Sequence, residues 1–146
     1  GCAKPGCQVA ARQQWVAREN LAQRVQFVGW LAANEQMRWG NRAQWYLSLP
    51  QSDSVAVSVL EAMAHGCVPL LSDLPANHEL VQDRANGWIV PDTLQGEDLQ
   101  QRCERVLPAL LQRAADIARS NREWVRQHGL FAPAVQNLVH TLQAFE

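Results

Sequence analysis

Two short apolar runs, separated by a helical pattern, constrain the fold of this chain most strongly. Residues 45–49 (WYLSL) form the first run, which is followed by turn-forming residues. From Val57 apolar side chains recur with helical spacing, and Gly66 stands where a glycine ends such a helix. Residues 68–71 (VPLL) form the second run, whose proline suits the start of a strand. This order predicts parallel strands joined by a crossover helix, with ligands outside the carboxyl ends of the strands.

Two acidic residues are expected at this ligand-binding edge. Asp53 lies in the loop after the first run, and Glu61 follows eight positions later on the helix. At 100° per residue, Glu61 falls opposite the apolar stripe that includes Val59 and Met63. A carboxylate can accept two hydroxyl hydrogen bonds, as a ribose diol offers, and Asp53 has the same capacity toward a sugar. Acids in such places also occur in α/β proteins without a site, so spacing alone leaves that alternative open.

The start of the same helix is suited to a phosphate group. The backbone N–H groups near Val55, Ala56 and Val57 are free of helical partners, and the helix dipole adds to their preference for an anion. The loop acid, the helix start and the helix acid together predict a nucleotide-sugar site.

Residues 60–69 (LEAMAHGCVP) resemble the donor-binding motif of retaining glycosyltransferases of the GT-B fold, in particular the large group called family 4. That motif has two glutamates separated by seven residues, followed by Ala-Met-Ala, a glycine and a proline. The resemblance implies that Glu61 binds the nucleotide ribose and that Asp53 contacts the donor sugar. This sequence departs from the motif at Asp53, which replaces a glutamate, and at Ser54, Val55 and Ala56, which replace the usual loop glycines.

The resemblance extends over most of the chain. Residues 24–31 (RVQFVGWL) are similar to a short strand of the family whose following backbone lies against the nucleotide base, which implies Gly29, Trp30 and Leu31 as contacts of the base. Residues 72–91 are similar to the family's next segment. The fold implied is α/β, a Rossmann-like parallel sheet with flanking helices that forms the C-terminal half of a GT-B fold and ends in a helical C-terminal tail.

We expect residues 1–146 to be the donor-binding C-terminal fragment of a longer enzyme, with an α/β core over 1–95 and helices over 96–146. The core pattern includes a strand over 25–28. Pro108 is expected to kink or break the first tail helix, and a last helix is expected over 132–145. Five tryptophans are expected in or beside the core: Trp15, Trp39, Trp45, Trp88 and Trp124.

The resemblance implies a glycosyltransferase that moves a sugar from a nucleoside-diphosphate sugar to a glycan or lipid-linked acceptor. The acceptor would bind through an N-terminal domain that this chain lacks, so no catalytic residue is assigned here and the fragment alone is expected to be inactive. No metal and no cofactor are implied, since the donor is a substrate. The implied location is cytoplasmic or at the inner face of the membrane, and peripheral membrane association of the full-length protein stays open.

Two alternatives remain from the sequence. One is a GT-B sugar-nucleotide epimerase, against which residues 60–69 argue. The other is a non-catalytic GT-B-like assembly domain, which Asp53 and the missing loop glycines favour.

Composition and charge exclude several other classes of protein. The net charge is −1, and the basic residues are spread among acids, which argues against a binder of nucleic acid or of a membrane surface. No apolar run approaches the roughly 18 residues of a membrane span. The four cysteines are too irregularly spaced for a disulfide framework, and Cys2 and Cys7 have no partner pair that would complete a zinc site. Among the histidines only His65 lies near the expected cleft, where a polar helix surface is the simpler interpretation.

Overall fold

The computed structural model describes residues 5–52 and 57–129. The chain divides into two compact units, Gly1–Gln36 and Met37–Glu146, and each is described by itself. The assignment of residues 1–146 to a donor-binding C-terminal fragment stays a prediction. Within the described ranges, every helix is too short or too polar to cross a lipid bilayer.

The first unit consists of helix α1 (Pro5–Arg18) and an extended segment that leads to helix α2 (Ala33–Arg42), which crosses into the second unit. The amide of Leu21 donates to the carbonyl of Val16, 2.9 Å away, and Val16 is buried. The strand expected over residues 25–28 does not form, so that prediction is wrong. Its apolar side chains remain partly exposed, and no strand in the described residues pairs with this segment, whereas a strand needs the backbone of a neighbour.

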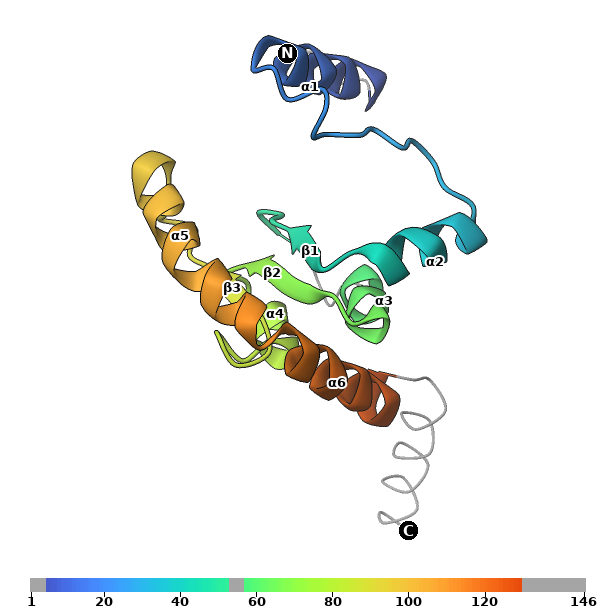
Figure 1. Cartoon of the computed structure of the whole chain (residues 1–146), viewed down its shortest axis with the longest axis vertical. Coiled ribbons are helices and arrows are strands. Elements are labelled where there is room, and N and C mark those ends of the chain that lie inside the picture. The colour runs from blue at the N-terminus through green and yellow to red at the C-terminus, as the bar shows by residue number, and fades with distance from the viewer. Residues whose placement is uncertain (1–4, 53–56, 130–146) are drawn as a thin grey trace. The chain divides into compact units, whose positions relative to one another are not determined.

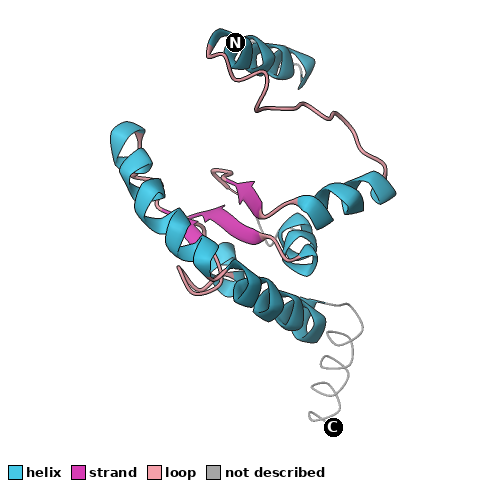
Figure 2. Ribbon diagram, in the orientation of Figure 1, coloured by secondary structure: helices cyan, strands magenta, loops and turns pink. Residues whose placement is uncertain are grey.

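The second unit is built around a three-stranded parallel sheet (Figures 1 and 2). Its strands are β1 (Trp45–Ser48), β2 (Val68–Ser72) and β3 (Trp88–Val90), in the order β1-β2-β3. Helix α3 (Val57–His65) connects β1 to β2, and helix α4 (Pro75–Leu80) connects β2 to β3. Each connection is a βαβ unit, as the sequence predicted for the first of them. All carboxyl ends of the strands therefore lie at one edge of the sheet.

Helices cover both faces of the sheet. On one face α5 (Gly96–Gln112) and the start of α6 (Ala114–Trp124) pack against the strands. The buried residues of this face are Val68, Leu70, Trp88, Val90, Val106, Leu110 and Ile117. On the other face α3 and α4 pack with the π-helical turn η1 (Val125–Gly129). The buried residues there are Val59, Met63, Leu71, Leu80, Val81, Ile89 and Val125. This arrangement confirms the predicted Rossmann-like parallel sheet with flanking helices.

Helix α5 continues through Pro108, so the expected break is absent. Proline lacks the N–H that would bond the carbonyl of Glu104, one turn earlier. Both residues are exposed, and water can therefore satisfy that carbonyl without ending the helix. The helix expected over 132–145 lies outside the described residues.

Gly66 ends α3, as predicted. It has a φ of +88°, and its N–H donates to the carbonyl of Met63 at 3.0 Å. The guanidinium group of Arg122, on α6, donates to the carbonyl of His65 at 2.9 Å. A side chain at position 66 would collide with that guanidinium group. The glycine thus permits both the left-handed turn and the contact between α3 and α6.

An asparagine pair fixes the turn before β3 to helix α6. The side-chain amide of Asn86 donates to Oδ1 of Asn121 at 3.0 Å, and the amide of Asn121 donates to the backbone carbonyl of Asn86 at 3.0 Å. Asn121 is completely buried. Because both amides are satisfied, the pair ties the turn to α6 without leaving a buried polar group unpaired.

Candidate functional site

The predicted site begins where β1 ends. Residues 49–52 follow the carboxyl end of β1, and α3 starts at Val57, whose side chain is exposed. Asp53, Val55 and Ala56 lie outside the described residues, so their expected roles stay predictions. The hydroxyl of Tyr46 donates to Oγ of Ser58 at 2.9 Å, which ties β1 to the first turn of α3. The start of α3 is therefore held at the carboxyl-end edge of the sheet.

Glu61 lies on the exposed side of α3, as the helical spacing predicted. Val59 and Met63, two positions before and after it, are buried against the sheet. Two residues turn an α-helix by about 200°, so a side chain between two buried ones projects away from the core. Glu61 is exposed. Packing against the sheet therefore orients this carboxylate outward.

His65 has a structural role at the other end of α3. Its Nδ1 lies 2.8 Å from Oδ1 of Asn41, on α2. Its ring lies so close to Gly40 that an added Cβ would be 2.6 Å from the ring atom Cδ2. The sequence suggested a polar helix surface, but the ring is half-buried and joins α2 to α3.

The carboxyl end of β2 carries an ion pair that the sequence analysis missed. Asp73 directly follows β2, and its Oδ1 lies 2.7 Å from Nε2 of His78, on α4. Both side chains are about half exposed. The available signal was the position of Asp73, because an acid directly after a buried strand of a parallel sheet stands at the ligand-binding edge. The pairing itself spans five residues across a turn, which fits no simple periodicity.

The residues expected to contact a base belong to the first unit and are described within it. Gly29 has a φ of +67°, and an added Cβ there would meet no atom within 4 Å. Trp30 is 97% exposed, and Leu31 is half-buried. Trp30 therefore presents nearly its whole indole to solvent, which is the state of an aromatic ring available for stacking.

Cys67 is a buried packing residue next to β2, and its thiol is unreactive. It is buried, and its thiol lies within 3.4 Å of the carbonyl oxygen of Ala43 and 3.7 Å of that of Gly40. Burial raises the pKa of the Cys67 thiol above its ordinary value, which disfavours the reactive thiolate. Across residues 5–52 and 57–129, no three His, Cys, Asp or Glu side chains gather in a way that could hold a metal ion.

Two cavities lie in the second unit, and His78 lines the larger of these two. One of about 270 Å³ lies between α5 and the turn before β3, and one of about 550 Å³ lies between α4 and α6. Glu61 lines neither of them. The candidate site is thus an open edge of the sheet in the described part of the chain, and it consists of one outward acid, a fixed helix start and a nearby ion pair.

Comparisons with known proteins concern the sequence of the chain and its fold. The sequence model described as glycosyl transferases group 1 matches residues 7–124. A comparison with curated proteins gave no match. Among solved structures, the chain is similar to a crystal structure of the C-terminal domain of a glycosyl transferase group 1 family protein (LpcC) from Francisella tularensis. The TM-score is 0.68 at 22% sequence identity, over 88% of this chain and 66% of that one. At this identity the likeness concerns the fold.

Proposed function

The chain belongs to the glycosyl transferases group 1 family, and from that premise we propose that it is the donor-binding part of a retaining enzyme. That enzyme moves a sugar from a nucleoside-diphosphate sugar to a glycan or lipid-linked acceptor. The acceptor binds through a further domain, and the chain alone catalyses no transfer. The family match favours neither the epimerase nor the non-catalytic domain.

The observation that carries the proposal is the outward orientation of Glu61. Its carboxylate projects from α3 opposite the buried residues Val59 and Met63. A carboxylate held in this way accepts both hydroxyl groups of a ribose, because its two oxygens match the spacing of a diol. Its rigid helix loses little entropy when the ligand binds.

The next part of the proposal concerns the diphosphate of the donor, which is assigned to the start of α3. We assign the diphosphate to the N–H groups around Val57, with Val55 and Ala56 completing the loop. The N-terminal end of a helix stabilises the negative charge that develops on a leaving diphosphate. This role requires neither a metal nor a cofactor.

Trp30, in the first unit, and Asp53, in the second, also have roles in the proposal. The exposed indole of Trp30, with the backbone of Gly29 and Leu31, receives the nucleotide base, and Asp53 accepts hydroxyl groups of the sugar. Asp53 acts on the sugar alone in this proposal. Asp53→Asn is therefore expected to slow transfer far more than it weakens binding of the free nucleotide.

A cytoplasmic location, with peripheral association at the inner face of the membrane, is part of the proposal because lipid-linked acceptors are embedded in a bilayer. Isotope transfer from a panel of nucleotide sugars tests the function in the complete enzyme. Transfer to an acceptor with retention of the anomeric configuration supports it. Isomerisation of the sugar nucleotide without an acceptor indicates an epimerase, and absence of both binding and turnover indicates an assembly domain.

A further inference from the structure

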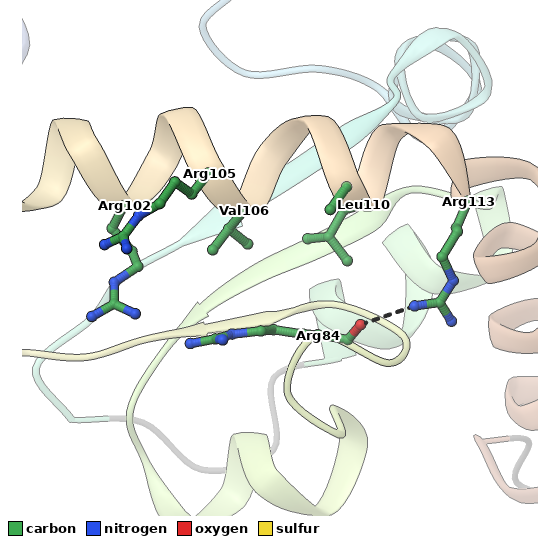
Figure 3. A pocket seen from close by; sticks show the side chains of 7 residues that line it. Arg84, Arg102, Arg105, Val106, Leu110 and Arg113 are labelled. Carbon is green, nitrogen blue, oxygen red and sulfur yellow. Dashed lines mark hydrogen bonds between the residues drawn. The ribbon is translucent and has the colours of Figure 1, made fainter.

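Four arginine side chains share the cavity of about 270 Å³ beside α5 (Figure 3). The cavity is lined by Arg84, Arg102, Arg105, Val106, Ala109, Leu110 and Arg113. Arg102 and Arg105 come from α5, Arg113 lies at the junction between α5 and α6, and Arg84 comes from the turn before β3. Val106 and Leu110 are buried and form an apolar floor. None of the described residues that line the cavity is acidic.

Most of this positive charge is not neutralised by the protein. The guanidinium group of Arg113 donates to the backbone carbonyls of Arg84 and Ala85, each at 3.3 Å. Nε of Arg84 lies 3.4 Å from a carboxylate oxygen of Asp83. In the part of the chain that the structure describes, Arg102 and Arg105 form no ion pair or hydrogen bond through their side chains. The cavity therefore has a strong excess of positive charge.

The backbone holds Arg84 in place at a conformational cost. Arg84 has a φ of +57°, in the left-handed region that favours glycine. Its N–H donates to the carbonyl of Gly87 at 2.7 Å, and Arg113 holds its carbonyl. Figure 3 shows the Arg84 side chain extending beneath α5 toward the end of the cavity where Arg102 lies. Several contacts thus fix an unfavourable backbone conformation, and the charged side chain points into a cavity. This combination is typical of ligand sites.

We propose that this arginine pocket binds a phosphate-bearing anion. A guanidinium group is planar and can donate two parallel hydrogen bonds to a phosphate, and several of them around one cavity match its spread of negative charge. The ligand is either a free phosphate ester or the headgroup of an anionic lipid, since both present the same group. Arg105 and Arg84 are exposed, so the pocket is open to either source.

The pocket is separate from the proposed donor site. The turn that holds Arg84 precedes β3, so it lies at the amino-end edge of the sheet, whereas residues 49–52 and the start of α3 lie at the carboxyl-end edge. Binding of the anion therefore goes beyond the proposed function and can be tested without a sugar donor.

The test compares two double variants that each remove two positive charges. Arg102→Gln with Arg105→Gln removes two guanidinium groups from the pocket and leaves Arg113, which holds the turn. The control is Arg119→Gln with Arg126→Gln. These arginines pair with Asp116 and Glu123 and lie outside the pocket. Thermal melting checks that both variants stay folded, and Arg105→Gln alone carries the same test if the pocket pair unfolds.

Two probes distinguish the sources of the anion. Inorganic pyrophosphate is titrated calorimetrically, and cosedimentation is measured with phosphatidylcholine vesicles that contain phosphatidylglycerol. We expect the unmodified chain and the control to bind at least one probe, and the pocket variant to bind it at least about tenfold more weakly, since each lost charge-assisted hydrogen bond accounts for about that factor. Binding of pyrophosphate indicates a soluble phosphate ester, and binding of vesicles alone indicates a lipid headgroup. The proposal is overturned if neither probe binds, or if the pocket variant and the control weaken equally.

Discussion

At the carboxyl-end edge of the sheet one carboxylate forms a pair with a histidine and another is carried on an outward helix face, whereas beside α5 four arginine side chains line one cavity. Asp73 is paired with His78, and Glu61 projects from α3. In the arginine pocket Asp83 is the one carboxylate that pairs with any of the four arginines among the described residues. The two regions therefore suit different chemistry, because carboxylates accept hydrogen bonds from sugar hydroxyls while guanidinium groups donate to phosphate.

The supports of the two regions also differ. The arginine pocket stands on Val106 and Leu110, which are part of the core between α5 and the sheet. The carboxyl-end edge stands on the loop after β1, where Leu49 is 48% exposed. Substitution of a core residue beneath a site is expected to lower both the stability of the protein and the binding of the ligand. Substitution at an exposed edge can lower binding alone.

The largest effect is expected from the floor of the arginine pocket. Leu110 is 2% exposed, and Leu110→Ala should lower the free energy of unfolding by about 2–5 kcal/mol through lost burial and a residual cavity. Urea denaturation measures this. Leu111→Ala, on the same helix and 48% exposed, is the matched control, and it and Leu49→Ala should each change stability by under about 1 kcal/mol. Equal losses at positions 110 and 49 would contradict the difference in support.

Glu61→Ala should show the opposite behaviour at the carboxyl-end edge. Loss of about two charge-assisted hydrogen bonds to the ribose should weaken nucleotide binding by about 2–4 kcal/mol, with little change in melting temperature. Calorimetric titration with UDP and GDP on the complete enzyme measures the affinity. Glu79→Ala, an exposed acid on α4, is the control. Unchanged affinity with a large fall in melting temperature would show that Glu61 is structural.

A smaller effect is expected from the ion pair after β2. Asp73→Asn removes the charge that pairs with His78, but both side chains are about half exposed, so the free energy of unfolding should fall by under about 1 kcal/mol. Chemical denaturation at low and high salt measures this, at an acidic pH such as about 5.5, where an ordinary imidazole is charged. The loss should shrink at high salt, since salt screens exposed charges. A salt-independent loss of several kcal/mol would mean that the pair organises the whole edge.

The smallest effect concerns pH at the amino-end edge, where Cys67 precedes β2. Because burial raises the pKa of its thiol, the Cys67 thiol loses its proton at a lower pH in the unfolded chain than in the folded one. Its contribution to stability is complete below about pH 8.5, the ordinary cysteine value, and is lost as pH rises through the folded pKa. Urea midpoints measured from neutral to alkaline pH should fall less steeply in Cys67→Ala. Identical slopes would show that this thiol does not contribute.

The sequence predicted the central unit well because its signals are local. Turn residues after β1, helical spacing from Val57, Gly66 at the end of α3 and the apolar run of β2 each specify one boundary. The strand over 25–28 was predicted from the same kind of local pattern, but its formation depends on a neighbouring strand. Trp88 is buried as expected, whereas Trp15 and Trp39 are exposed, because a periodic pattern does not show whether a partner surface exists.

The arginine pocket could not be predicted in this way. Arg84 is separated from Arg102 by the whole of β3 and the start of α5, and along the sequence the basic residues are interspersed with acids. That spacing argued against a binder of nucleic acid or of a membrane surface. The fold brings the turn before β3 against α5, and the four arginines then share one cavity. Charge clustering in space is thus set by topology, which the composition does not contain.

The asparagine pair that ties the turn to α6 also bears on the chemical lifetime of the protein. Asn86 is followed by Gly87, and Asn-Gly is the dipeptide most prone to deamidation, because the glycine N–H can reach the asparagine side chain. Gly87 is hard to replace, since a Cβ there would lie 2.7 Å from the carbonyl oxygen of Pro69. Oδ1 of Asn86 accepts the N–H of Gln82 at 2.8 Å while its amide donates to Asn121, so cyclisation requires the turn to open. Deamidation would place a carboxylate against the buried amide of Asn121, and the rate of deamidation at Asn86 is therefore expected to follow how often that turn leaves α6.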